Sequence, residues 1–107
     1  MKDIRLTDGS LLEIGINFYT LKLINDLRLV KLFEKYDKDR ENDDLILEIC
    51  GKLIFVILRS NGKKVDEEEA MILVPPDDEE INNLINQFME KLEKFKKKQE
   101  NKMKAPK

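Results

Sequence analysis

The sequence contains no histidine, no tryptophan and a single cysteine, and only three prolines and four glycines occur among its 107 residues. Without histidine or a second cysteine, the chain can form no histidine-based catalytic triad, no His–Cys zinc site and no intramolecular disulfide. The scarcity of glycine and proline argues against an all-β fold rich in turns. No apolar run reaches the ~18 residues of a membrane span, and we expect no signal peptide. These absences predict a small soluble protein of the cytoplasm with no membrane partner.

Charged residues are abundant, because they make up 39% of the chain against about 25% in an average domain. The 22 acidic residues nearly balance the 20 basic ones, and the hydrophobic share of 41% is ordinary for a folded chain. This composition predicts amphipathic helices with solvated outer faces. The length fits one domain, which we place at residues 1–92, followed by a lysine-rich, partly disordered tail at residues 93–107.

Residues 2–16 are predicted to form a β-hairpin, because apolar and polar residues alternate on both sides of the Asp8-Gly9 pair. A two-residue loop would mix apolar and charged side chains on each face of this hairpin. A three-residue loop with Gly9 in the left-handed conformation instead pairs Ile4 with Leu12 and gathers the alternating apolar residues on one face. An isolated hairpin is marginal in water, so this face must pack on the rest of the chain.

The remainder of the sequence has mainly helical periodicity. The predicted helices are 18–36 after an Asn17 cap, 45–59 after a cap at Asp43 or Asp44, 67–73 after Asp66, and a last helix starting at Asp77. The β-branched run at 53–58 leaves a strand as an alternative there. The predicted fold is mainly α, with the N-terminal β-hairpin packed on a bundle of three to four helices.

Two features of the sequence could indicate a metal site or a catalytic residue. The segment 66–80 carries eight carboxylates and no base, but it lacks the spacing of a calcium loop, and acids at two helix starts account for it. Cys50 lies between Ile49 and Leu53 in an apolar stretch, which predicts a buried side chain and not a nucleophile. We therefore predict no catalytic residue, no metal site and no cofactor.

The charge of the chain is divided unevenly. Eight lysines and two glutamates give residues 91–107 a charge of +6, whereas twelve bases and twenty acids give residues 1–90 a charge of −8. Such a tail can bind nucleic acid by charge alone, although no aromatic residue follows Phe95 to stack on bases. We interpret the tail as a solvated terminus and do not expect a nucleic-acid partner. A small regulatory or nucleic-acid-associated protein that uses this tail is one candidate function.

The apolar stripes are wider than one core of this size readily hides. Either part of this surplus forms a protein-binding surface rimmed by charge, or a monomer buries all of it. The residue pattern leaves both possibilities open.

The order of elements resembles a viral group. A strand ending in Thr7-Asp8-Gly9, Asn17-Phe18 opening a helix, an apolar middle helix and a last helix starting at the Pro-Asp-Asp-Glu-Glu run of 76–80 are similar to the tail assembly chaperones of long-tailed bacteriophages, especially phages and prophages of Gram-positive hosts. The resemblance covers about residues 3–92. Members of that family are small, mainly α-helical and not enzymes. They bind the tape measure protein and keep its long helices soluble while tail-tube subunits assemble around it.

The resemblance implies a chaperone with the tape measure protein, and possibly the tail tube protein, as partner. It also implies self-association and a location in the cytoplasm of the bacterial host, outside the mature virion. The family supplies no binding-residue motif, so we predict the binding surface from the width of the apolar stripes. Its predicted members are Phe18, Leu29, Leu32, Phe33, Tyr36, Phe88, Leu92 and Phe95.

Overall fold

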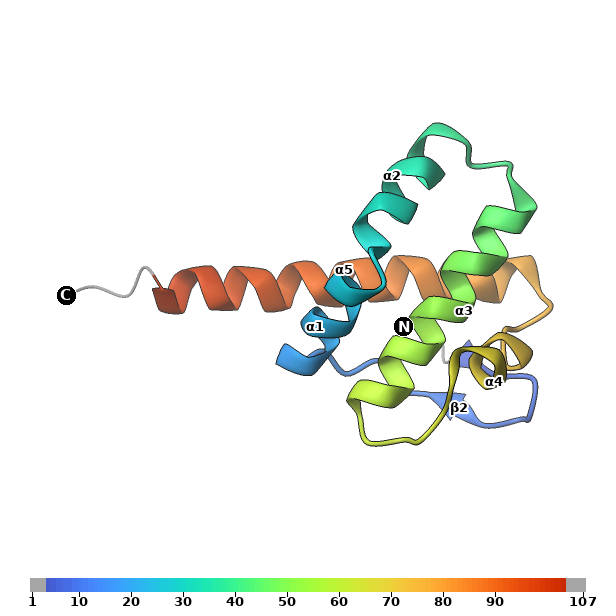
Figure 1. Cartoon of the computed structure of the whole chain (residues 1–107), viewed down its shortest axis with the longest axis horizontal. Helices are drawn as coiled ribbons and strands as arrows, with labels where there is room; N and C mark the ends of the chain where they lie inside the picture. Colours follow the sequence, from blue (N-terminus) through green and yellow to red (C-terminus); the bar gives the residue numbers. More distant parts are fainter. Residues whose placement is uncertain (1–3, 104–107) are drawn as a thin grey trace.

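A computed structural model describes residues 4–103, and over this range the chain forms five helices and one two-stranded sheet (Figure 1). The elements are β1 (Ile4–Arg5), β2 (Leu11–Leu12), α1 (Phe18–Asp26), α2 (Leu29–Lys38), α3 (Asp43–Ser60), α4 (Glu67–Ile72) and α5 (Asp78–Met103). Helix α3 packs against α1, α2, α4 and α5, and β1 packs on α5. The predicted mainly helical fold with an N-terminal hairpin is therefore confirmed.

The hairpin has the predicted three-residue turn. Ile4 pairs with Leu12, the Leu6 N–H donates to the Ser10 carbonyl (2.9 Å), and Gly9 has a φ of 88°, which costs a glycine little. The Ser10 hydroxyl donates to the Asp8 carboxylate (2.6 Å), and so does the Ser10 amide. These two hydrogen bonds hold the pKa of Asp8 below its usual value. The apolar face is buried as expected. Within residues 4–16, regular pairing covers less of the chain than predicted, and residues 2 and 3 of the predicted hairpin lie outside the described residues.

The single helix predicted over 18–36 is wrong, because the chain breaks between α1 and α2 (Figure 1). Arg28 adopts the left-handed conformation (φ 55°), a common way for a helix to end, although the usual residue is glycine. The change of direction lets α1 bury Ile24 while α2 buries Leu29. The apolar residues of 18–36, which form too wide a stripe for one helix, are therefore divided between the buried faces of α1 and α2.

Helix α3 is the central helix of the core, and it excludes the strand alternative for residues 53–58. It starts earlier than predicted, because Asn42, rather than Asp43 or Asp44, caps it by accepting a hydrogen bond from the Leu45 amide (3.1 Å). Buried residues occupy most of its circumference: Leu45, Ile49, Cys50, Gly51, Leu53, Ile54, Val56, Ile57 and Ser60. An apolar helix of this kind requires neighbours on several sides, which α1, α2, α4 and α5 supply.

The two acidic segments begin helices, as predicted. Asp66 and Glu69 form a reciprocal capping box at the start of α4, and Asp77 accepts a hydrogen bond from the Glu79 amide just before α5 (3.0 Å). Helix α5 continues past Phe95 to Met103. The partly disordered tail proposed for residues 93–107 stays a prediction, and residues 104–107 lie outside the described residues.

A polar network joins the start of α1 to the end of α3. Asn17 caps α1 by accepting a hydrogen bond from the Thr20 amide (3.0 Å), while its own side-chain amide donates to the Ser60 carbonyl (3.0 Å). The buried Thr20 hydroxyl donates to the Ser60 hydroxyl (2.9 Å). Asn61 adds a hydrogen bond to the Gly15 carbonyl (3.0 Å). We call Asn17, Thr20, Ser60 and Asn61 the polar anchor.

We expect Asn17→Ala to lower the free energy of unfolding by about 2 kcal/mol, because it removes a helix cap and leaves the Ser60 carbonyl without that donor. Asn82→Ala is the matched control, since Asn82 is exposed within α5 and should change stability by less than about 0.5 kcal/mol. Urea unfolding followed by circular dichroism measures both variants. Equal stability of the two would show that the polar anchor does not hold α1 in place.

Candidate protein-binding site

Three of the eight predicted binding residues belong to the core. Leu29 and Phe88 are fully buried, and Leu92 is 8% exposed, so the expectation that they lie on an exposed surface is wrong. The width of an apolar stripe gives the number of apolar positions but not which of them a neighbouring element covers. Here α3 packs on both α2 and α5, and little or nothing of these three side chains remains exposed.

Three other predicted residues lie half-buried on α2. Leu32, Phe33 and Tyr36 pack against the core and keep part of their surface exposed. The guanidinium of Arg40 lies 5.4 Å from the centre of the Tyr36 ring, in cation–π range. These residues are therefore accessible only in part.

The last two predicted residues come together although they are far apart in the sequence. The rings of Phe18, at the start of α1, and Phe95, on α5, are 5.5 Å apart between centroids and meet edge to face at 79°. Phe18 nevertheless remains 66% exposed. The Asn17 cap sets the position of this ring, because Phe18 is the first residue of the helix that it caps.

A small depression of about 180 Å³ lies beside this pair, lined by Ile16, Lys91, Lys94, Phe95 and Lys98. We call these five residues together with Phe18 the aromatic patch. Its centre is apolar and its rim carries lysines; an apolar centre with a polar rim is the usual arrangement of a protein interface. Of the three lysines, Lys94 also pairs with Glu90 along the helix (3.3 Å).

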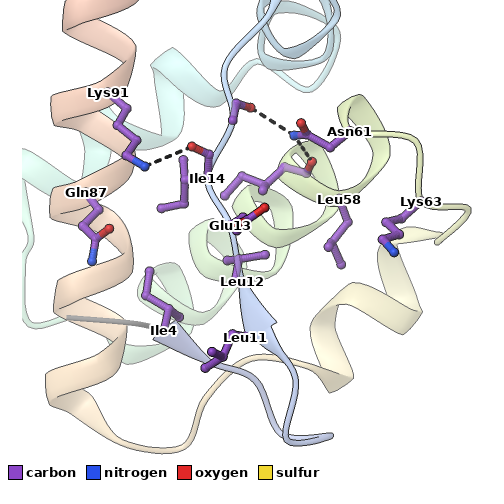
Figure 2. A pocket seen from close by; sticks show the side chains of 12 residues that line it. Ile4, Leu11, Leu12, Glu13, Ile14, Leu58, Asn61, Lys63, Gln87 and Lys91 are labelled. Carbon is purple, nitrogen blue, oxygen red and sulfur yellow. Dashed lines mark hydrogen bonds between the residues drawn. The ribbon is translucent and has the colours of Figure 1, made fainter. Parts of the chain in front are cut away.

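A larger groove, which sequence analysis missed, runs beside β2 (Figure 2). Its volume is about 790 Å³, and we call it the β2 groove; its lining includes Leu11, Glu13, Leu58, Asn61, Lys63 and Lys91. Lys91 reaches over from α5 to donate to the Ile14 carbonyl (3.2 Å), and Asn61 reaches from the end of α3 to the Gly15 carbonyl. Lys91 therefore belongs to both the β2 groove and the aromatic patch.

One feature of the sequence would have indicated this groove. Leu11 is an apolar residue on the otherwise polar face of the hairpin, and it is 52% exposed. A hairpin also always has outer edges that its own two strands leave unpaired.

Within residues 4–103, no group of three or more Asp, Glu or Cys side chains is arranged to hold a metal ion. Over the same range, no helix combines the length and the apolarity needed to cross a membrane.

In comparisons with protein-family models, curated proteins and solved structures, no match to this chain was found. The candidate function therefore rests on the two surfaces and on the resemblance of the sequence pattern.

Cys50 is fully buried, as predicted, and burial raises the pKa of its thiol to about 12. At pH 8 we expect on the order of 10³-fold less thiolate in the folded protein than in the unfolded chain, whose thiol has a pKa near 8.5. Labelling with a thiol reagent should be correspondingly slow in buffer and fast in denaturant. Similar rates in both would show that Cys50 is accessible in the folded protein.

Proposed function

We propose that this chain is a non-enzymatic chaperone that binds the apolar faces of a long helical partner. This is the role of the tail assembly chaperones that its sequence resembles, and it makes a tape measure protein the proposed client. The observation that carries the proposal is the exposed ring of Phe18, held on Phe95 at the centre of the aromatic patch.

The Phe18 ring is suited to binding because it is exposed and positioned at the same time. Fully burying an aromatic side chain of this size contributes about 1.5–3 kcal/mol. Phe18 is 66% exposed, so most of its surface is still available for burial by a partner. The Asn17 cap and the contact with Phe95 already restrict its position, so binding loses little conformational entropy.

The surroundings of the ring suit an amphipathic helix. The depression beside Phe95 is large enough for an apolar side chain, and successive anchors on one face of a helix recur every three or four residues. Lys91, Lys94 and Lys98 follow α5 with this same spacing. They would face carboxylates at the edge of the partner's apolar stripe, so the proposed client helix is flanked by Glu or Asp.

Further features of the role belong to the same proposal. We propose the tail tube protein as a second partner and self-association as a way to cover Phe18 when no client is bound. The cytoplasm of the bacterial host is the proposed location, with the protein absent from the mature virion.

A second candidate is a nucleic-acid-associated regulator, and the position of Phe95 is the observation that favours it. Sequence alone showed no aromatic residue among the lysines beyond this point, but the structure surrounds Phe95 with Lys91, Lys94 and Lys98. Aromatic rings among cations are typical of single-stranded nucleic-acid binding. The edge-to-face contact with Phe18 already occupies part of the Phe95 ring, so we rank this candidate second.

The two candidates respond differently to salt and to truncation. If residues 96–107 are deleted, we expect binding to a tape measure protein to survive, because Phe18, Phe95 and most of the depression remain. Nucleic-acid binding through the lysines would instead fall strongly between about 50 and 200 mM salt. It would also weaken strongly with the deletion, which removes six of the eight lysines of residues 91–107. Fluorescence anisotropy with a labelled oligonucleotide and with a labelled helical client fragment distinguishes these outcomes.

We expect Phe18→Ala to weaken client binding by about tenfold or more, because it removes the central apolar contact. The experiment co-expresses the chain with the tape measure protein of the same genome and measures the soluble complex and its affinity. Ile72→Ala is the matched control, since Ile72 is 70% exposed on α4, away from the aromatic patch (Figure 1).

Both variants should unfold within about 1 kcal/mol of the parent chain, because each side chain is largely exposed. Client binding that is equal in Phe18→Ala and Ile72→Ala would contradict the proposed surface. Absence of any complex with the parent chain would contradict the proposed function itself.

A further inference from the structure

The outer edge of β2 has main-chain groups that no strand pairs. In an antiparallel ladder, successive residues direct their N–H and C=O groups alternately toward the partner strand and away from it. The Leu6 amide bonds to the Ser10 carbonyl, so Ser10 and Leu12 face β1. Leu11 therefore directs its N–H and C=O groups to the outer edge, and the same alternation, continued one residue past the end of β2, places those of Glu13 there too. Within the described part of the chain, nothing bonds to these groups.

This edge opens into the β2 groove. Leu11 and Glu13 both line the groove, and both are exposed. The next outward carbonyl, that of Gly15, already accepts a hydrogen bond from the Asn61 side chain. The available stretch of edge therefore begins at Leu11 and ends where Asn61 closes it, beside Lys63 and Leu58 (Figure 2).

We propose that the β2 groove binds an extended, acidic segment of a partner protein, which adds to the hairpin as a third strand next to β2. The proposal does not depend on the helix-binding function, because it uses main-chain groups of Leu11 and Glu13 and not the ring of Phe18. Strand addition of this kind obtains affinity from main-chain hydrogen bonds and specificity from the side chains along the groove.

The charge of the groove lining favours an acidic segment over a basic one. Lys63 and Lys91 line the β2 groove against a single carboxylate, that of Glu13. The depression that shares Lys91 adds Lys94 and Lys98. Among the described residues, neither Lys63 nor Lys91 makes an ion pair. The ammonium of Lys91 is held on the Ile14 carbonyl, on the α5 side of β2, so Lys63 is the lysine that lies beside the outer edge (Figure 2). Complementary charge steers association and fixes the register of a bound segment.

Apolar contacts define the remaining chemistry of the segment. Leu11 and Leu58 expose apolar surface in the groove, and an added strand directs alternate side chains to the same face. The fitting segment therefore alternates apolar or β-branched residues with acidic ones.

Hydrogen exchange of individual amides tests this inference directly. The probe is a capped peptide of sequence EVTVEVTE, and its matched control is KVTVKVTK, which has the same strand propensity and the opposite charge. At a concentration about ten times its Kd, the acidic peptide should slow exchange of the Leu11 and Glu13 amides by about tenfold. The basic peptide should leave both amides unchanged.

Two substitutions at one position separate main-chain from side-chain binding. Glu13→Pro removes the outward N–H but no hydrogen bond to β1, so we expect it to weaken binding of the acidic peptide by about tenfold. Glu13→Ala retains the N–H and removes a like charge, so it should bind at least as well as the parent chain. Equal peptide affinity in both variants would overturn strand addition.

A charge variant keeps the test decisive if Glu13→Pro does not fold. Lys63→Glu changes an exposed side chain, and it should weaken the acidic peptide about fivefold and favour the basic one. Without peptide, protection of the Leu11 and Glu13 amides is also measured against the concentration of the chain itself. If protection rises with that concentration, a second copy occupies this edge, and the assignment to a partner segment is overturned. Loss of helical-client binding in Phe18→Ala with intact peptide binding would leave the inference standing.

Discussion

The attachment of residues 14–20 to the end of α3 is the constraint on which both candidate surfaces depend. The polar anchor joins this segment to α3 through side chains that reach main-chain carbonyls, namely those of Gly15 and Ser60. On one side of the anchor the chain continues back into β2, and on the other it begins α1. The same few hydrogen bonds therefore set the position of the β2 edge and that of the Phe18 ring.

The two surfaces differ in what they offer a partner. The aromatic patch presents side chains, so it suits an element whose own main chain is already satisfied, as in a helix. The β2 groove presents main-chain donors and acceptors, which only an extended segment can pair. Lys91 lies between them and hydrogen-bonds to the Ile14 carbonyl. A client with a helical and an extended part could therefore contact both surfaces, with carboxylates meeting the lysines.

Local sequence signals predicted the local structure well. The hairpin register followed from alternation and from Gly9, and the caps at Asn17 and Asp66 followed from side chains that can accept amide hydrogen bonds. The break at Arg28 was missed because no glycine marks it. The burial of Leu29 and Phe88 was missed because it depends on how helices cross, which periodicity along one helix does not determine. Phe18 and Phe95 were predicted as surface residues one helix at a time, and the contact between their rings was missed because it joins residues distant in the sequence.

The polar anchor also bears on why Phe18 is exposed. Thr20 and Ser60 are buried within a largely apolar core, where apolar residues of similar size would avoid the cost of desolvating two hydroxyl groups. Their mutual hydrogen bond, unlike an apolar contact, forms in one orientation of α1 relative to α3. A helix whose rotation is set in this way has a definite outer face, and the first residue on it is Phe18. The exposure of this ring is therefore a consequence of specified packing, as a preorganised binding surface requires.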